Sequence, residues 1–452
     1  MPLLPRLLLS ALLLTSLLAT VKAVEPPSSL LIKNGYVMSM RAGEADRENT
    51  DVLIRGDTIA AIGKNLHAAD ARVIDATGKF VLPGFVDAHS HLWITTLRGQ
   101  FRNRDGKFFP VSNRLGAVMK PDDIYTAMYT GAIEQLASGI TTSSDFFDNI
   151  HGPAAGDAGY RALNDAGIRA IMFYGGPDKT LATPIDLTHL KQLMAKPHDR
   201  LLPGLAWRLP RDLHDEAAWT LRDREYAFAR DNHLPLQVHV SGEADAMFNA
   251  LIQRHYLAPF VTVVHATQAT PAQLNALEKA GGSLALTPIS EERVGYGLTR
   301  YDQFKGVTRQ GLGLDGNALA GSANMFATLR LAALTQSGAT QDETGPDPRR
   351  LLELATRRSA DAAGLGRITG TIEVGKRADI QIINPDALNM SGFGGGDPAS
   401  LIVYSAEPEN VDTVVVDGRI LKLSGQMQHT NITALVARAN ASARHLREDA
   451  AK

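Results

Sequence analysis

Five residues of this chain end predicted strands and could meet at one place in a folded protein. His89 and His91 stand two residues apart, and because side chains alternate along a strand, both imidazoles point to the same face. His239, His265 and Asp315 each end a later predicted strand. One histidine at a strand end is more often a buried polar residue than a ligand. The strand-ending histidines include the one closely spaced pair among all 13, which favours a shared metal ion.

Imidazole and carboxylate side chains suit one divalent ion, with zinc expected first and iron or manganese as alternatives. The chain has no cysteine, so any ligand must be nitrogen or oxygen. An ion with an open position lowers the pKa of bound water toward ~7 and polarises the carbon under attack. Asp315, if it touches that water, can accept the proton as general base.

Short apolar runs alternate with helical segments over residues 85–367, and this pattern predicts a (β/α)₈ TIM barrel with its chemistry at the carboxyl ends of the strands. Thr270 is expected to cap the helix that begins at Pro271. The eight predicted strands are FVDAHSH, ITTSSDFF, IRAIMFYGG, LLPGLAWRLP, LPLQVHVSG, FVTVVHAT, GSLALTPIS and GLGLDG.

Two segments rich in β-formers and turn residues flank this middle, at 24–84 and 368–425. Asn34-Gly35 and Asp417-Gly418 are typical of hairpin turns. We expect both segments to join in one small β-sandwich, so that the fold is an α/β barrel with a domain built from both chain ends. Residues 426–452 are Ala-rich and predict a terminal helix exposed to solvent.

The first 23 residues have the pattern of a cleaved signal peptide. Arg6 precedes the apolar run 7–18, and small residues at Val21 and Ala23 suit signal peptidase. The run is shorter than the ~20 residues that a membrane-spanning helix needs. We expect export to the periplasm or outside, with no stable membrane span after cleavage; an N-terminal anchor without lipid is the alternative.

The overall charge of −2 and the absence of a basic cluster argue against nucleic acid as a partner. The chain has no Gly-x-Ser-x-Gly elbow, which argues against the commonest serine hydrolases. A small-molecule substrate is expected, and the oligomeric state stays open, a homo-oligomer included.

Several motifs resemble the amidohydrolase superfamily, and more narrowly its deaminase and chlorohydrolase branch. They are LPGFVDAHSH, the single histidines on later strands, the run TPISEERVGYGLTRYDQFKGVTRQGLGLDGNA, and Gly370 to Ile380. The resemblance implies that four residues bind one catalytic ion and that His265 lies beside the water or the developing charge. It also implies a single ion, because the chain has no lysine between Lys196 and Lys279 to form the carboxylated bridge of two-ion members. The four implied ligands are His89, His91, His239 and Asp315.

Glu243 departs from the pattern of that branch, in which a glutamate three residues after the fifth-strand histidine shuttles protons. Here the segment His239-Val-Ser-Gly-Glu243 is one residue longer. A bulge at Gly242 could return Glu243 to the site as a catalytic residue. Alternatively, Glu243 caps or solvates the following helix, where a first-turn acid is favoured; ring deamination then loses support to hydrolysis of an amide or lactam.

Further side chains near the predicted strand ends are candidates for the pocket. We expect Trp93, Trp207 and Arg211 to contact the substrate, as apolar walls with a cationic anchor. Asp145 and Asp148 stand beside Asn149 and Gly152, which favours turn chemistry, and they are left out of the predicted site.

The function that these residues predict is metal-dependent hydrolysis of a non-peptide C–N bond, by deamination or by cleavage of an amide or cyclic amide. A peptidase-like or lactamase-like amide hydrolase is the alternative, with Arg208 or Arg211 holding a carboxylate. Outside enzymes, a periplasmic metal-binding receptor or a degenerate barrel is the alternative. Asp315 argues against both of these, because a pure binder needs no residue that accepts a proton from water.

Overall fold

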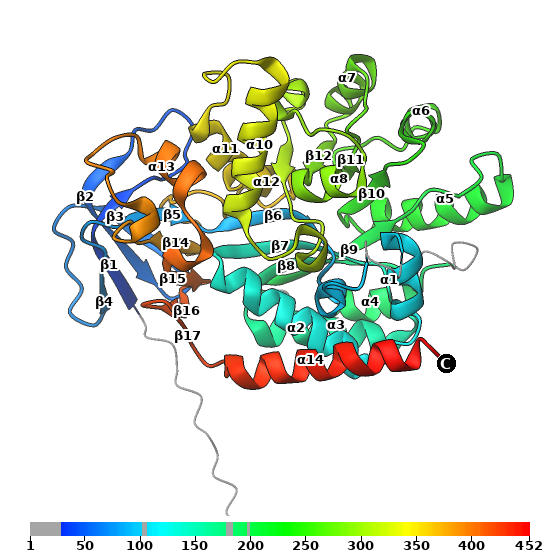
Figure 1. Ribbon diagram of the computed structural model, residues 1–452, viewed down its shortest axis with the longest axis horizontal. Helices are drawn as coiled ribbons and strands as arrows, with labels where there is room; N and C mark the ends of the chain where they lie inside the picture. Colours follow the sequence, from blue (N-terminus) through cyan, green and yellow to red (C-terminus); the bar gives the residue numbers. More distant parts are fainter. Residues whose placement is uncertain (1–28, 102–105, 178–183, 197–198) are drawn as a thin grey trace, which may run out of the picture.

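The computed structural model describes the chain except for residues 1–28, 102–105, 178–183 and 197–198. The predicted signal peptide therefore lies outside the described residues. The described chain forms two sheets, a parallel one surrounded by helices and a smaller one at one side of it (Figure 1). None of the described helices combines the length and the apolar character that crossing a membrane requires.

The larger sheet has eight neighbouring parallel strands, which confirms the predicted (β/α)₈ barrel. β7 is buried along its whole length, as expected where a parallel sheet is covered on both faces. The strands are β6 (Phe85–Ser90), β7 (Ile140–Phe147), β8 (Arg169–Tyr174), β9 (Leu201–Trp207), β10 (Leu236–Val240), β11 (Val261–His265), β12 (Ser283–Leu286) and β13 (Gln310–Leu312).

Helices follow the strands and cover the barrel. Thr270 caps α7 as predicted: its hydroxyl accepts from the backbone N–H of Gln273, and Pro271 occupies the first turn. The main covering helices are α2 (Pro121–Ala137), α3 (Pro153–Ala166), α4 (Leu187–Met194), α5 (Glu216–Asp231), α6 (Ala244–Gln253), α7 (Pro271–Lys279), α8 (Pro288–Val294) and α10 (Met325–Thr340). Further helices include η1 (Leu92–Leu97), α1 (Phe108–Gly116), α9 (Asn317–Ala320), α11 (Pro348–Leu354), α12 (Arg357–Ala362) and α13 (Pro398–Ser405).

The barrel closes between its first strand and the segment that follows its last. The backbone N–H groups of Leu314 and Asp315 donate to the carbonyl of His89, and Leu314 N–H also donates to the carboxylate of Asp87. Gly313 packs against this seam, where an added Cβ would lie 2.7 Å from backbone atoms of His89. Because only glycine allows that approach, the seam brings the ends of β6 and β13 together.

The smaller sheet joins nine strands from both ends of the chain, as the sequence predicts. Eight of them form one hydrogen-bonded path in which β14 pairs with β5, so that Ile380 lies opposite Pro83, and the ninth, β4, pairs with β1 beside this path. Figure 1 shows its blue and orange strands side by side. The strands are β1 (Ser29–Val37), β2 (Arg47–Arg55), β3 (Thr58–Gly63), β4 (Arg72–Asp75), β5 (Phe80–Pro83), β14 (Ile380–Ile383), β15 (Val411–Val416), β16 (Arg419–Leu423) and β17 (Gln426–Met427).

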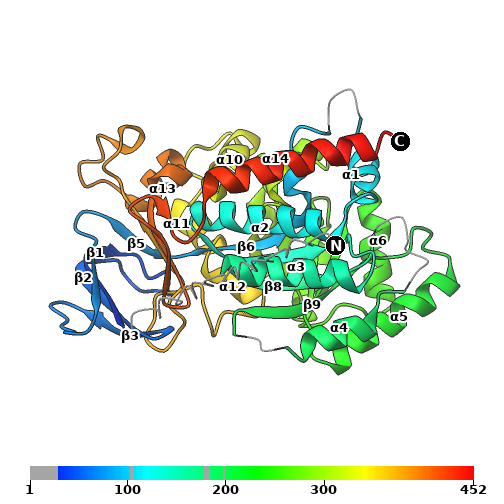
Figure 2. The same ribbon diagram turned by 90° about the horizontal axis from the view of Figure 1, so that it is seen from below.

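The terminal helix α14 (Ile432–Asp449) lies along α2 on the outside of the barrel (Figure 2). Ser442 donates to the carboxylate of Asp123, and Leu446 is buried against the same surface. Most other side chains of α14 are exposed or half-buried. This helix therefore packs on the outside of the barrel, against α2 and η1.

Candidate metal centre and active site

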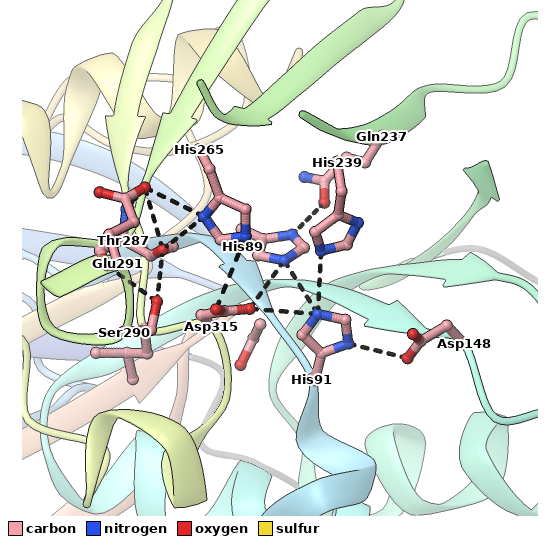
Figure 3. Close-up of polar contacts among 12 residues, drawn as sticks. His89, His91, Asp148, Gln237, His239, His265, Thr287, Ser290, Glu291 and Asp315 are labelled. Carbon is pink, nitrogen blue, oxygen red and sulfur yellow. Dashed lines mark hydrogen bonds and ion pairs between the residues drawn. The ribbon is translucent and has the colours of Figure 1, made fainter. Parts of the chain in front are cut away.

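The structure brings together the four residues that the sequence suggests as metal ligands. His89 lies one residue before the end of β6, His91 follows that strand, His239 lies on β10, and Asp315 follows β13. One ligand atom from each lies within 4.8 Å of all the others. Figure 3 shows the three imidazoles and the carboxylate pointing toward one centre. The arrangement follows from the barrel, which presents strand ends at a common rim.

The atoms that face the centre are three Nε2 nitrogens and one carboxylate oxygen. Nε2 of His91 lies 3.2 Å from Nε2 of His89 and 3.3 Å from Nε2 of His239. Oδ1 of Asp315 lies 3.3 Å from Nε2 of both His89 and His91. His89, His91 and Asp315 are buried, so bulk water does not screen the interactions among these groups.

Hydrogen bonds behind two of the imidazoles decide which nitrogen faces the centre with a lone pair. Nδ1 of His89 donates to Oε1 of Gln237 at 2.7 Å, and the amide of Gln237 is oriented by donating to the carbonyl of Ala88. Nδ1 of His91 donates to Oδ1 of Asp148 at 3.0 Å. When both rings are neutral, their Nε2 atoms present lone pairs to each other at 3.2 Å, which is unfavourable unless a proton or a metal cation lies between them. The residues present therefore fit a divalent ion.

Burial and charge shift the pKa values of three of the four groups in the direction that metal binding needs, and His91 is the exception. Burial lowers the pKa of His89 to about 4 and holds that of His239 well below its usual range, so both are neutral ligands. Burial opposes a charge on His91 as well, but the carboxylates of Asp148 and Asp315 raise its pKa to about 10. Burial also opposes ionisation of Asp315, yet the surrounding imidazoles hold its pKa well below the usual value. The cluster thus attracts positive charge.

Asp148 belongs to the site, although turn chemistry seemed to account for it in the sequence; that interpretation is wrong. Its Oδ1 accepts from the indole N–H of Trp93 at 2.7 Å as well as from His91, and its Oδ2 accepts from the guanidinium of Arg208. Burial opposes ionisation of Asp148, but the positive charges of His91 and Arg208 hold its pKa below the usual range. Asp145 is also buried, and it accepts from the backbone N–H of Leu92 at 2.7 Å.

His265 ends β11 beside the centre without being one of the four converging residues. Its Nε2 lies 3.9 Å from Oδ2 of Asp315, and its Nδ1 faces Thr287 and Glu291 on the opposite side (Figure 3). The φ angles of His265 and Asp315 are +71° and +57°, a region that non-glycine residues rarely adopt. Such strain clusters at functional sites, where the surrounding fold holds it in place.

The cavity in front of the centre has two connected parts. An inner chamber of about 50 Å³ reaches His91, His265 and Asp315 and includes Trp93 in its wall. An outer chamber of about 1040 Å³ opens from it. Tyr296 borders both chambers, and sequence reasoning did not single it out.

Glu243 and Arg211 line the outer chamber and not the inner one. Glu243 is exposed at the position just before α6, and Gly242 turns the chain there with a φ of +74°. Glu243 therefore shares the outer chamber with one metal ligand, His239, but does not line the inner chamber that reaches His91 and Asp315. Arg208 borders both chambers, but its guanidinium also contacts Asp148.

Trp207 lines neither chamber, contrary to the expected substrate contact. Its side chain is completely buried and packs against Tyr226 and Tyr256 under the covering helices. The neighbouring Ala206 packs with Phe146 in another cluster of the barrel. Because side chains alternate along β9, only one of two adjacent residues can face the interior.

Comparisons with known proteins agree with this geometry. The chain matches the amidohydrolase family over residues 80–421, and it therefore belongs to that family. It is 26% identical over 436 residues to a 5'-deoxyadenosine deaminase of Methanobrevibacter smithii, covering 90% of this chain and 94% of that protein. It is 28% identical over 423 residues to a 5-methylthioadenosine/S-adenosylhomocysteine deaminase of Acetivibrio thermocellus, covering 87% and 94%.

Solved structures share the fold over nearly their whole length. An adenosine deaminase from Xanthomonas campestris with bound zinc has a TM-score of 0.79 at 22% identity, covering 94% of this chain and 99% of that one. The atrazine chlorohydrolase of Arthrobacter aurescens TC1 complexed with zinc has a TM-score of 0.77 at 24% identity, covering 92% and 100%. Family membership and the converging ligands together make this chain a metal-dependent hydrolase that acts on carbon–nitrogen bonds.

Proposed function

We propose that this protein hydrolyses an amide or cyclic amide bond of a small molecule with one divalent ion, zinc first, held by His89, His91, His239 and Asp315. The observation that carries the proposal is the convergence of three Nε2 nitrogens and a carboxylate oxygen on one centre. Nitrogen and oxygen ligands of this kind suit zinc, and the two solved relatives described above contain it. A bound ion supplies Lewis acidity, which lowers the pKa of water and polarises the scissile group.

Asp315 and His265 are the residues that move protons in this proposal. Oδ1 of Asp315 faces the ligand imidazoles, and Oδ2 faces His265 at 3.9 Å. Oδ2 accepts a proton from the attacking water as its oxygen bonds to carbon. Nε2 of His265 takes this proton from Oδ2 and gives it to the nitrogen as the C–N bond breaks. General acid–base catalysis of this kind contributes about 10²- to 10⁴-fold.

The position of Glu243 favours amide cleavage over ring deamination. A deaminase of the resembled branch needs the glutamate next to its metal ligands, whereas Glu243 is exposed in the outer chamber. Deamination of an amino-substituted heterocycle is the second candidate, and the names of the similar deaminases support it.

One experiment tests the function and separates the two reactions. Metal content is measured on protein purified without chelators, and the same sample is screened against amides, lactams and aminopurines. We expect about one zinc per chain and release of an amine or a ring-opened acid without free ammonia. Ammonia released from an aminopurine would move the assignment to deamination, and metal-free protein that hydrolyses substrates at the full rate would refute the metal-dependent mechanism.

Export of the mature protein is a separate proposal, supported by the signal-like pattern of residues 1–23. We expect the mature chain to begin at Val24. N-terminal sequencing of protein from the periplasmic fraction tests this, and a cytoplasmic chain that begins at Met1 would contradict it.

A further inference from the structure

Behind His265 lies a buried carboxylate that the proposed mechanism does not use. Oε1 of Glu291 lies 3.2 Å from Nδ1 of His265, and the exposed fraction of Glu291 is 0%. Glu291 stands in the first turns of α8, on the side of His265 away from the cavity (Figure 3). A wholly buried carboxylate is unfavourable unless its oxygens are well hydrogen-bonded, so its position requires an explanation.

Donors from one short segment hold Glu291 in place. Its Oε1 accepts from the backbone N–H of Thr287 at 2.9 Å, and its Oε2 accepts from the hydroxyl of Thr299. The hydroxyl of Ser290 donates to the hydroxyl of Thr287, which also lies 3.1 Å from Nδ1 of His265. These hydrogen-bond donors approach the carboxylate from several sides and fix its direction toward His265.

The contact decides which nitrogen His265 presents to the cavity. An ionised carboxylate only accepts hydrogen bonds, so Nδ1 carries the hydrogen and donates to Glu291. Nε2 is then the atom that faces Oδ2 of Asp315 at 3.9 Å. A carboxylate behind a histidine commonly fixes ring orientation and tautomer in this way.

We propose that Glu291 is the positioning residue of this hydrolase, holding the ring of His265 so that Nε2 faces the leaving nitrogen. The proposal rests on the proposed function for the role of His265. It assigns to the pair His265–Glu291 the proton-shuttling role that Glu243 would have in a deaminase of the resembled branch. Glu291 acts only through His265 and touches neither the substrate nor the ion.

Kinetics of Glu291→Gln test the proposal, with Glu292→Gln as the matched control. Glu292 is the next residue of α8, and its Oε1 accepts from Thr335 instead of His265. We expect Glu291→Gln to lower kcat roughly 10- to 100-fold while KM and metal content stay as in the wild type. Glu292→Gln should keep the wild-type kcat. Equal kcat values for Glu291→Gln and the wild type would overturn the proposal.

A double-mutant comparison separates positioning from a structural role. On a His265→Ala background, Glu291→Gln should cause no further loss of kcat, because the residue through which it acts is gone. A further loss as large as that in the wild-type background would show that Glu291 supports the fold instead. Thermal unfolding of each variant verifies that the chains compared are folded.

Nitrogen-15 NMR of the histidine rings in the zinc-loaded protein gives a readout that needs no substrate. We expect the His265 signals, assigned with His265→Asn, to show hydrogen on Nδ1 in the wild type and a mixture of tautomers in Glu291→Gln. Unchanged tautomers would overturn the proposal. If no C–N substrate is found, the proposed function fails, while this measurement still decides whether Glu291 positions His265.

Discussion

The two sides of the cavity are built differently. On the inner side, three histidine rings each contact a buried polar side chain through the nitrogen that faces away from the centre. The pairs are His89 with Gln237, His91 with Asp148, and His265 with Glu291. On the outer side, Glu243 and Arg211 are exposed and belong to loops beyond β10 and β9. We therefore expect the inner side to be preorganised for chemistry and the outer side to meet the variable part of a substrate.

Removing two inner ligands should have the largest effect. In a His89→Ala/His91→Ala variant we expect metal content to fall from about one ion per chain to nearly none. Activity should fall at least about a thousandfold, because the Lewis acid supplies several kcal/mol. Elemental analysis and kcat/KM measure both. A His67→Ala/His214→Ala control changes two exposed histidines and should behave like the wild type; metal retained in the first variant would contradict the ligand assignment.

Loosening an inner ligand without removing it should have an intermediate effect. Asp148→Asn weakens the acceptor that orients His91 and contacts Trp93 and Arg208. We expect metal affinity to fall about 10- to 100-fold, measured by competition with a chelator of known affinity. Asp157→Asn changes an exposed carboxylate elsewhere and serves as the control. Unchanged affinity in Asp148→Asn would show that His91 needs no support.

A change on the outer side should alter binding more than chemistry. Arg211→Gln is expected to raise KM by up to about tenfold with kcat unchanged, since an exposed charge contributes about 1 kcal/mol or less. Arg224→Gln, on the exposed face of α5, is the control. A large loss of kcat with unchanged KM would place Arg211 on the inner side.

The smallest effect is expected for Glu243→Gln. Because Glu243 is exposed outside the inner chamber, kcat should stay within about threefold of the wild type, as for an ordinary surface substitution. Steady-state kinetics with the best substrate of the screen measure this. A hundredfold loss would show that the loop at Gly242 brings Glu243 to the substrate during turnover, and the contrast between the two sides would disappear.

The barrel and its converging residues could be predicted because they depend on local patterns. Eight apolar strands alternate with helices, and polar residues such as His89 and His239 stand where those strands end. Residues that act through a neighbour give no such signal. Glu291 looks like any helical glutamate until the turn at Thr287 directs it toward His265.

Positions that depend on register or on backbone direction were harder to predict. Trp207 ends a strand, which favours a place in the pocket, but the register of β9 turns its side chain toward the helices. Asp148 follows two phenylalanines in a sequence typical of turns, yet β7 carries it to the rim beside His91. One extra residue before Glu243 decides its direction through the φ angle of Gly242, which the sequence does not show.

The seam between His89 and Asp315 has a consequence for how the protein matures. Its two sides lie more than two hundred residues apart in the chain, so their contact closes a very long loop. A growing chain cannot complete the ligand set until the eighth strand has been made. An ion that binds only the finished set stabilises the folded state by mass action, so the melting temperature should rise with zinc concentration. The ion would thus stabilise the closed barrel only after the last strand has joined.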